Sequence, residues 1–250
     1  MIDLKEIREA LSNGELFLEY LPFVSLADGR CTGGEALLRW RRNGMVIPPD
    51  RFIPYAENTP VSGLLTYWVI DTAAAELGEW LRANHDAKIS INVPPEVFGR
   101  GGLEYAARKA GIADLVGQVI LEVTERGIPD HIGLNALNGM ALAGVRIALD
   151  DVMPVGLNLA VLSRGNFDMI KLDREMIGEI EPGKPAPKWL SAVSALAQGG
   201  HVQVVAEGIE TEWQLGALRD AGVREGQGFY FSHSLPARLF IDYHARAARA

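Results

Sequence analysis

Polar residues that can bind metal ions recur along this sequence at the ends of short apolar runs. One of them, Glu35, stands within such a run. The residues that close the other runs are Asn92, Glu122, Asp150 with Asp151, Lys171, Glu207 and Gln227. These side chains offer oxygen ligands rather than thiols or imidazoles, which suits Mg²⁺, Mn²⁺ or Ca²⁺ better than structural zinc. Adjacent carboxylates can bridge two cations, and that arrangement serves in-line displacement at phosphorus.

Each of these residues also has a simpler explanation. A single Asp or Glu after a strand usually caps a helix or accepts a hydrogen bond in a loop. Lys171 alone fits a surface ion pair, whereas within the set it would orient a water or stabilise developing negative charge. A Schiff-base amine is the alternative role for Lys171, although nearby carboxylates favour its protonated form. Repetition over most of the predicted strands favours a functional site.

The elements that must position these residues alternate between β-branched runs and longer helical stretches, which is typical of βα units. The predicted strands are Leu16–Leu26, Gly34–Trp40, Lys88–Val93, Gln118–Val123, Val145–Leu149, Phe167–Leu172, Val202–Ala206 and Gly226–Phe231. The predicted helices are Leu4–Leu11, Thr66–Leu81, Glu96–Ala110, His131–Ala143, Lys188–Ala197, Glu212–Ala221 and Ala237–Ala250. About eight such units predict an α/β fold, a single-domain TIM-like (β/α)8 barrel, with an open doubly wound sheet as the competitor. In both folds the carboxyl ends of the strands carry the chemistry.

Composition limits the class of partner. The 250 residues, 48% of them hydrophobic, suffice for one large globular domain. The net charge is −8, and a protein that binds duplex nucleic acid would be expected to carry a basic excess. The charge therefore argues against duplex nucleic acid and leaves a small anionic nucleotide open as a ligand.

Cysteine content and the lengths of the apolar runs indicate the cellular compartment in which the chain works. A lone cysteine, Cys31, cannot form an intramolecular disulfide, which fits a reducing environment. The first residues are too charged for a signal peptide, and no uncharged apolar run is long enough for a membrane helix. We therefore expect a cytoplasmic chain that makes no membrane contact of its own.

The ordered motifs resemble the EAL domain family, whose name matches the start of Glu35-Ala36-Leu37-Leu38-Arg39-Trp40. The motifs that follow in the family's order are Pro48…Phe52-Ile53…Ala56-Glu57, Asn92, Glu122-Val123-Thr124-Glu125, Asp150-Asp151, Lys171-Leu172-Asp173, Ala206-Glu207-Gly208-Ile209-Glu210 and Gln227-Gly228-Phe229. The resemblance runs over residues 10–240, so we treat residues 1–250 as one EAL-type phosphodiesterase domain.

The resemblance implies a barrel that hydrolyses cyclic di-GMP to linear pGpG with Mg²⁺ or Mn²⁺, and that Ca²⁺ inhibits. It assigns one metal to Glu35, Asn92, Glu122 and Asp150, and a second to Asp150, Asp151 and Glu207. Lys171 would contact the nucleophilic water, with Glu35 and Glu207 as the other catalytic residues. The implied substrate contacts are Arg39, Leu37, Asp173, Glu210, Gln227 and Phe229, and Glu125 would brace the loop after Asp151.

Three segments depart from the family's pattern. After Asp151 the family usually has Phe-Gly-(Thr/Ala)-Gly-Tyr, and this chain has Val152-Met153-Pro154-Val155-Gly156. Two glycines, which allow conformations closed to other residues, are thereby replaced. Leu21 stands where a ligand-facing Gln is common, and His233-Ser234 stands in place of Arg-Pro. The altered loop threatens catalytic rate and regulation more than ligand binding.

These departures leave a second function open. With the loop changed, the domain would act as a cyclic di-GMP receptor or as an interaction scaffold with little or no turnover. The resemblance further implies a homodimer and a place within a larger sensor protein.

Overall fold

The structure is a computed structural model that describes residues 2–124, 131–152, 165–200 and 202–247. Its strands are β1 (Leu16–Ser25), β2 (Cys31–Arg42), β3 (Met45–Ile47), β4 (Lys88–Asn92), β5 (Val119–Thr124), β6 (Arg146–Val152), β7 (Met169–Leu172), β8 (Gln203–Ala206) and β9 (Glu225–Gly226). Its α-helices are α1 (Leu4–Asn13), α2 (Ile53–Ala56), α3 (Pro60–Ala83), α4 (Gly102–Lys109), α5 (His131–Leu142), α7 (Arg174–Gly178), α8 (Trp189–Gly199), α9 (Glu212–Asp220) and α10 (Ala237–Ala247).

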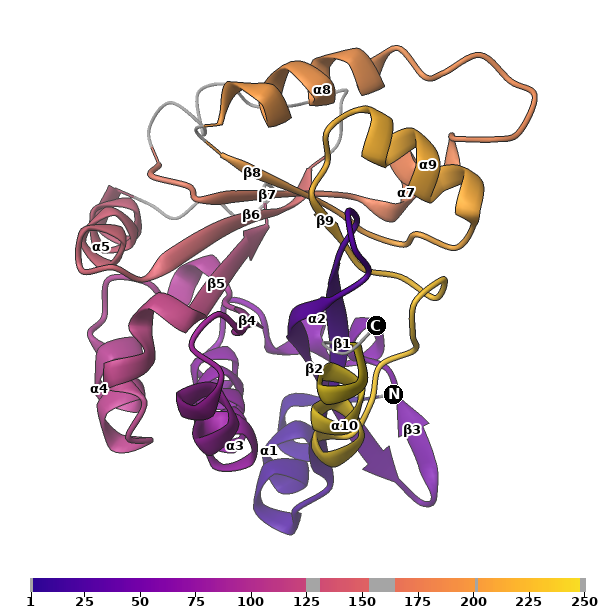
Figure 1. Ribbon diagram of the computed structural model, residues 1–250. Coiled ribbons are helices and arrows are strands. Elements are labelled where there is room, and N and C mark those ends of the chain that lie inside the picture. Colours follow the sequence, from indigo (N-terminus) through magenta and orange to yellow (C-terminus); the bar gives the residue numbers. More distant parts are fainter. Residues whose placement is uncertain (1, 125–130, 153–164, 201, 248–250) are drawn as a thin grey trace.

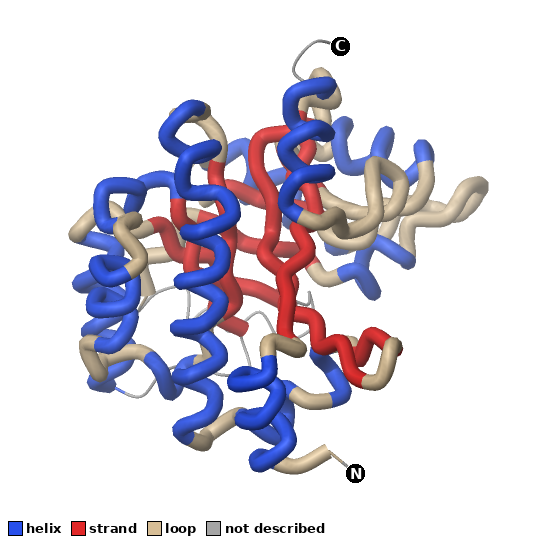
Figure 2. Tube along the Cα trace, turned by 90° about the horizontal axis from the view of Figure 1, so that it is seen from below, coloured by secondary structure: helices blue, strands red, loops and turns tan. Residues whose placement is uncertain are grey.

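Within the described part of the chain the strands form one closed sheet. Their order is β1-β9-β8-β7-β6-β5-β4-β2-β3, and the pairing of β1 with β2 closes the ring while β3 extends β2 as a hairpin. The helices surround the strands (Figure 1), and the view from below shows them around the sheet (Figure 2). The predicted TIM-like (β/α)8 barrel in a single domain is confirmed.

The first strand runs against its neighbours. β1 pairs antiparallel with both β2 and β9, whereas the pairs from β2 and β4 round to β8 and β9 are parallel. Antiparallel strands can be joined by a tight turn without a crossover helix, and the short segment around Asp28-Gly29 makes that connection. The strict βα alternation that the sequence suggests therefore begins only after β2.

Helix α10 covers β1 and β2 from outside. Its residue Phe240 is fully buried, with ring centroids 5.6 Å from Tyr20 and 5.2 Å from Trp80. Gly34 on β2 allows this approach, because a Cβ there would lie 2.7 Å from the Phe240 ring. The C-terminal helix thus packs directly behind the strand segment that carries Glu35.

Alternation of side chains along the strands separates the barrel interior from the helix-facing layer. On β6, Ile147 and Leu149 pack outward in the large apolar clusters, while Ala148 lies inside. The residues that form this inner apolar layer are Phe23, Ile120, Ala148, Met169 and Val205. By the same alternation, Asp150 and Lys171 point inward one step above this layer, toward the carboxyl end of the barrel.

Two predicted elements are wrong in extent. The strand predicted at Gly226–Phe231 ends at Gly226, and the residues after it form turns. The helix predicted at Glu96–Ala110 is a short 3-10 turn, Pro95–Val97, followed by α4. Gly99 and Gly101 separate these two pieces with φ values of 78° and 70°, which an α-helix cannot accommodate.

No described helix combines the length and the apolar composition that crossing a membrane requires.

Candidate active site

The polar strand-end residues converge at one end of the barrel, which we call the mouth. Parallel pairing places Asn92 beside Glu122. The same pairing aligns Lys171 with Val205, two residues before Glu207. Contacts between side chains from seven strands or strand ends then join them into one network. The predicted site residues that this network contains are Glu35, Asn92, Glu122, Asp150, Lys171, Glu207 and Gln227.

Lys171 is the centre of this network and is fully buried. Its Nζ lies 3.1 Å from Glu35 Oε2 and 2.8 Å from Glu122 Oε2. It also lies 3.2 Å from Asp150 Oδ1 and 2.5 Å from Glu207 Oε1. We refer to these five residues as the Lys171 cluster. One ammonium thus faces four carboxylates, so its charge alone does not balance theirs, and a further cation would be attracted to the cluster.

Glu35 is held in a fixed orientation by two amides. Asn92 Nδ2 donates to Glu35 Oε1 at 2.9 Å, and Gln227 Nε2 donates to Glu35 Oε2 at 2.7 Å. Gln227 Nε2 also lies 3.2 Å from Glu207 Oε1. Because the Asn92 amide nitrogen donates to Glu35, the amide oxygen of Asn92 remains an acceptor that could serve as an additional ligand atom.

A backbone irregularity brings both members of Asp150-Asp151 to the same site. Consecutive residues of a regular strand point to opposite faces. The pairing of β6 with β7 shifts between Leu149 and Val152, and Asp151 has a φ of 55°. This left-handed conformation costs a non-glycine residue roughly 1–2 kcal/mol. As a result, oxygens of Asp150, Asp151 and Glu207 lie within 4.8 Å of one another.

The turn after Glu207 depends on a glycine. Gly208 has a φ of 66°, and a Cβ at this position would lie 2.5 Å from the Cβ of Arg174. Only glycine combines that conformation with so close an approach. The chain can therefore turn sharply beside α7 directly after it has delivered Glu207 to the mouth.

Burial and like charge shift the pKa values of the cluster. Burial lowers the pKa of Lys171, but the four carboxylates outweigh this effect and raise it well above its usual range. Burial raises the pKa of Glu122 well above normal, and the neighbouring charge of Glu35 adds to the shift. Burial likewise raises the pKa of Asp150, and that of Glu207 to about 8. These directions favour a charged Lys171, and a cation bound among the carboxylates would oppose the upward shifts of their pKa values.

The pKa of Glu35 shifts in the opposite direction. Burial alone would raise it, but Lys171, Gln227 and Asn92 together lower it below its usual value. The neighbours of Glu35 therefore favour its ionised form, in contrast to the other carboxylates of the cluster.

The residues present fit a divalent cation. Glu122 Oε1 is a buried carboxylate oxygen with no hydrogen-bond donor among the described residues, and the buried Asp150 Oδ1 lies 3.2 Å from Lys171 Nζ. A buried acceptor without a partner is costly unless an ion or water satisfies it. The nearby oxygens of Asp151 and Glu207 complete a hard, all-oxygen donor set of the kind that Mg²⁺ and Mn²⁺ bind.

Gln227 is the one expected substrate-contact residue placed in this network, and the others contact different parts of the described chain. Asp173 caps α7, where its side chain accepts from the backbone N–H of Glu175 at 2.6 Å. Glu210 is exposed, and its backbone N–H donates to Gln214. Phe229 is 61% exposed and packs against His233 in a tilted arrangement, with a centroid distance of 4.2 Å. Leu37 is half-buried and pairs with Glu19 across β1 and β2.

Arg39 is held at the edge of the mouth by Glu19, which the sequence did not indicate, and by Ser234, which belongs to one of the segments that depart from the family's pattern. Its Nε donates to Glu19 Oε2 at 3.0 Å, and its Nη2 lies 3.3 Å from Ser234 Oγ. Ser234 Oγ in turn donates to the same Glu19 oxygen at 2.7 Å. The sequence held one signal for Glu19. It lies two residues before Leu21 on the same strand, so both side chains point to the face of the sheet that carries Glu35.

Two expectations lie outside the described residues. They are the bracing role of Glu125 and the conformation of the divergent loop beyond Val152.

Comparison with known proteins places the chain among its relatives. The EAL domain family matches residues 4–234, and the chain belongs to this family. It is 32% identical over 246 residues to the probable cyclic di-GMP phosphodiesterase PdeB of Escherichia coli, a match that covers 95% of this chain and 46% of PdeB. The chain spans less than half the length of the first curated relatives it matches, 46%, 31% and 36% of their sequences.

Two solved structures agree with this fold. The phosphodiesterase MucR of Pseudomonas aeruginosa in complex with c-di-GMP has a TM-score of 0.84 at 33% identity, and the match covers 95% of this chain and 98% of that chain. BlrP1 of Klebsiella pneumoniae, in a complex with manganese and cyclic di-GMP, has a TM-score of 0.72 at 25% identity. That match covers 88% of this chain and 56% of BlrP1.

Proposed function

We propose that this domain hydrolyses one phosphodiester of cyclic di-GMP to give linear pGpG, with Mg²⁺ or Mn²⁺ as cofactor. The observation that carries the proposal is the Lys171 cluster, in which four of the six expected metal-binding residues contact one lysine. The other two lie beside it, since Asn92 donates to Glu35 and an oxygen of Asp151 lies within 4.8 Å of oxygens of Asp150 and Glu207. The relatives named as cyclic di-GMP phosphodiesterases support the substrate.

Two cation positions follow from the donor set. Glu35, Asn92, Glu122 and Asp150 would hold one ion, while Asp151 and Glu207 would share Asp150 to hold the second. Bound ions of this kind polarise a phosphoryl oxygen and lower the pKa of a coordinated water. The unsatisfied oxygen of Glu122 supports this assignment.

Lys171 acts in the proposed reaction as a charged hydrogen-bond donor. Because the carboxylates hold its pKa high, it does not accept a proton and does not offer a free amine to a carbonyl. It keeps the carboxylates at fixed separations and can donate to the attacking water or to the phosphoryl oxygens as negative charge develops. The same reasoning disfavours a Schiff-base enzyme.

Arg39, at the edge of the mouth, is the residue that we propose contacts a phosphate of the substrate. A charge-assisted hydrogen bond contributes about 1.5–3 kcal/mol, so we expect Arg39→Ala to raise KM roughly 10- to 100-fold and to change kcat little. Glu19→Gln is the matched variant, since it keeps a hydrogen-bond acceptor beside Arg39 and removes the competing charge. Its KM should stay at or below that of the wild type. Steady-state kinetics measure both values, and an unchanged KM in Arg39→Ala would remove Arg39 from the substrate site.

Metal binding should also be visible as stability. A ligand present at 100 times its Kd adds about 2.7 kcal/mol. For a chain of this size that free energy raises Tm by about 5–10 °C. We expect Mn²⁺ or Mg²⁺ to raise Tm by this amount, EDTA to reverse the shift, and Glu122→Gln with Asp150→Asn to abolish it. Differential scanning calorimetry measures the shift, and a Tm insensitive to both metals would contradict a cation site at the mouth.

A second candidate, a receptor or scaffold without turnover, is favoured by the replacement of two family glycines with Met153 and Val155. Product analysis by liquid chromatography, run beside calorimetric binding of cyclic di-GMP, separates the candidates. Accumulation of pGpG supports the enzyme, tight binding without product over hours supports the receptor, and no binding supports the scaffold.

The setting of the domain is part of the same proposal. We propose a cytoplasmic domain that works as a homodimer and together with a sensor domain. The greater length of the curated relatives supports a larger assembly. Light scattering of the purified chain, with and without cyclic di-GMP, tests dimerisation.

A further inference from the structure

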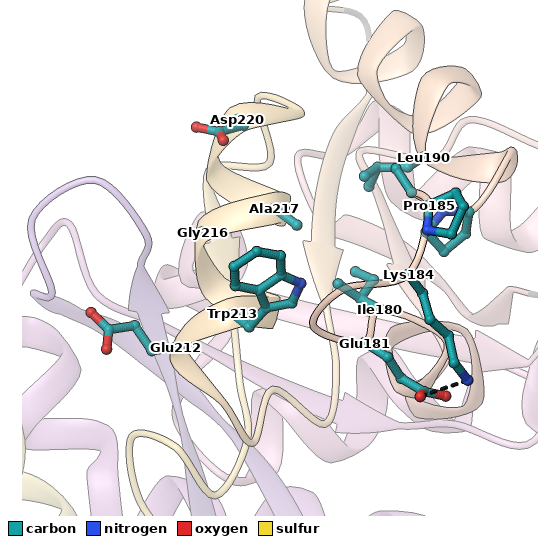
Figure 3. Close-up of a pocket in the computed structure, with 12 residues that line it drawn as sticks. Ile180, Glu181, Lys184, Pro185, Leu190, Glu212, Trp213, Gly216, Ala217 and Asp220 are labelled. Carbon is teal, nitrogen blue, oxygen red and sulfur yellow. Dashed lines mark ion pairs between the residues drawn. The ribbon is translucent and has the colours of Figure 1, made fainter.

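An apolar groove with an acidic rim lies on the outer surface of the barrel, apart from the residues of the Lys171 cluster. It is bounded by α9, by the start of α8 and by the loop of residues 179–188 that precedes α8 (Figure 3). The side chains of Trp213 and Ala217 on α9 face those of Ile180, Pro185 and Leu190 across it. Its volume is about 260 Å³.

Trp213 is the most informative residue of the groove. It is 54% exposed in the first turn of α9, although indole is among the side chains most favoured in buried positions at interfaces. The groove combines this exposed aromatic ring with proline, leucine and alanine surfaces. Contiguous apolar patches rimmed by polar residues mark interaction sites.

The rim of the groove is negatively charged. Glu212 and Asp220 lie along α9, and neither has an ion-pair partner within the described ranges. The one lysine in the lining, Lys184, is paired with Glu181 at 2.6 Å. The described lining therefore contains no unpaired basic side chain, and Glu212 and Asp220 give its rim a net negative charge.

The loop side of the groove is stiff. Pro185 and Pro187 fix their own φ angles. The backbone N–H of Lys184 donates to Glu181 at 3.3 Å, and that of Leu190 donates to Pro187 at 3.0 Å. A wall that is ordered before binding reduces the entropy lost on association.

These features select one class of occupant. The volume falls below the roughly 300–1,000 Å³ of small-molecule sites, so it suits a side chain or two of a larger ligand. The acidic rim disfavours nucleic acid and anionic lipid surfaces. We propose that the groove docks a basic peptide segment of a partner protein. An apolar side chain enters beside Trp213, and flanking Lys or Arg residues pair with Glu212 and Asp220 and contact the indole face.

A fluorescein-labelled peptide of alternating Leu and Arg, added to the full chain in excess Mg²⁺, tests this docking by anisotropy. Mg²⁺ keeps the carboxylates of the mouth from acting as a second basic-peptide site. We expect saturable binding that Trp213→Ala weakens at least about tenfold. The double variant E212K/D220K should weaken it similarly, and higher salt should weaken the wild-type complex.

Matched controls come from the peptide and from the protein. Peptides with Glu in place of Arg, or Ser in place of Leu, should bind poorly. Tyr105→Ala removes another exposed aromatic residue, 69% exposed on α4, and should leave binding unchanged. The proposal is overturned by no binding of the Leu-Arg peptide, by equal binding of the Glu peptide, or by unchanged affinity in Trp213→Ala. It is also overturned if a second copy of the chain occupies the groove, seen in sedimentation as self-association that Trp213→Ala abolishes.

Discussion

Lys171→Met should reduce the formation of pGpG from cyclic di-GMP by at least about a thousandfold, as expected for loss of a charged group aimed at the reacting centre. Lys171 is fully buried and contacts four carboxylates. Removing its charge leaves those carboxylates to repel one another, and it also removes the only cationic donor in the described cluster. Product chromatography in Mn²⁺ measures the effect.

The control for this variant is Lys109→Met. Lys109 also pairs with a carboxylate, Asp71 at 3.1 Å, but its side chain is 60% exposed. It should keep full activity. Circular dichroism and cyclic di-GMP binding would show whether Lys171→Met is folded, and Lys171→Arg provides a second variant that keeps the charge. If a folded Lys171→Met retained the wild-type rate, the assigned role of Lys171 would be wrong.

The second large effect is expected on stability, at the opposite end of the barrel from the mouth. Glu225 lies 2.5 Å from Lys88 Nζ, accepts from Gln203 at 2.7 Å and is bonded to Thr32 at 2.5 Å. Lys88 is buried, and its pKa is lowered by burial despite the opposing charge of Glu225. Removing one partner of a buried pair leaves a buried charge unpaired, which costs about 3–5 kcal/mol.

We therefore expect Glu225→Leu to lower the free energy of unfolding by about 3–5 kcal/mol. Urea unfolding followed by circular dichroism measures this change. The double variant with Lys88→Met should recover most of the loss, because apolar replacement of both partners is close to neutral. Asp114→Asn breaks an exposed pair with Arg82 and should cost less than about 1 kcal/mol. Equal losses for the buried and exposed pairs would contradict this account.

The sequence predicted the closed barrel because its strands and helices alternate with a clear period. The exceptions have local causes. The apolar run after Gln227 looks like a strand, but Gly228 has a φ of 152° and its backbone packs against Ile209, where a Cβ would lie 2.2 Å from the Ile209 carbonyl oxygen. The following Phe229 and Tyr230 are consequently exposed on turns.

The residues of the candidate site were predicted better than their arrangement. Strand ends are readable from sequence, so the members of the Lys171 cluster could be named in advance. The irregularity that turns Asp150 and Asp151 to the same side depends on a shift in pairing with a distant strand. The contacts that hold Arg39 join residues from β1, β2 and the segment before α10. A local sequence pattern cannot indicate contacts between segments so far apart. Long-range register, rather than local propensity, decided both features.

The central claim is that the mouth of this barrel is a working phosphodiesterase site. The most direct measurement is chromatographic detection of pGpG from cyclic di-GMP and Mn²⁺, with EDTA as the negative control and a variant carrying Phe-Gly-Thr-Gly-Tyr at residues 152–156 beside the native chain. We predict metal-dependent pGpG from the native chain, and an equal or higher rate from the variant. Tight binding of cyclic di-GMP by the native chain without any pGpG over hours would contradict the claim.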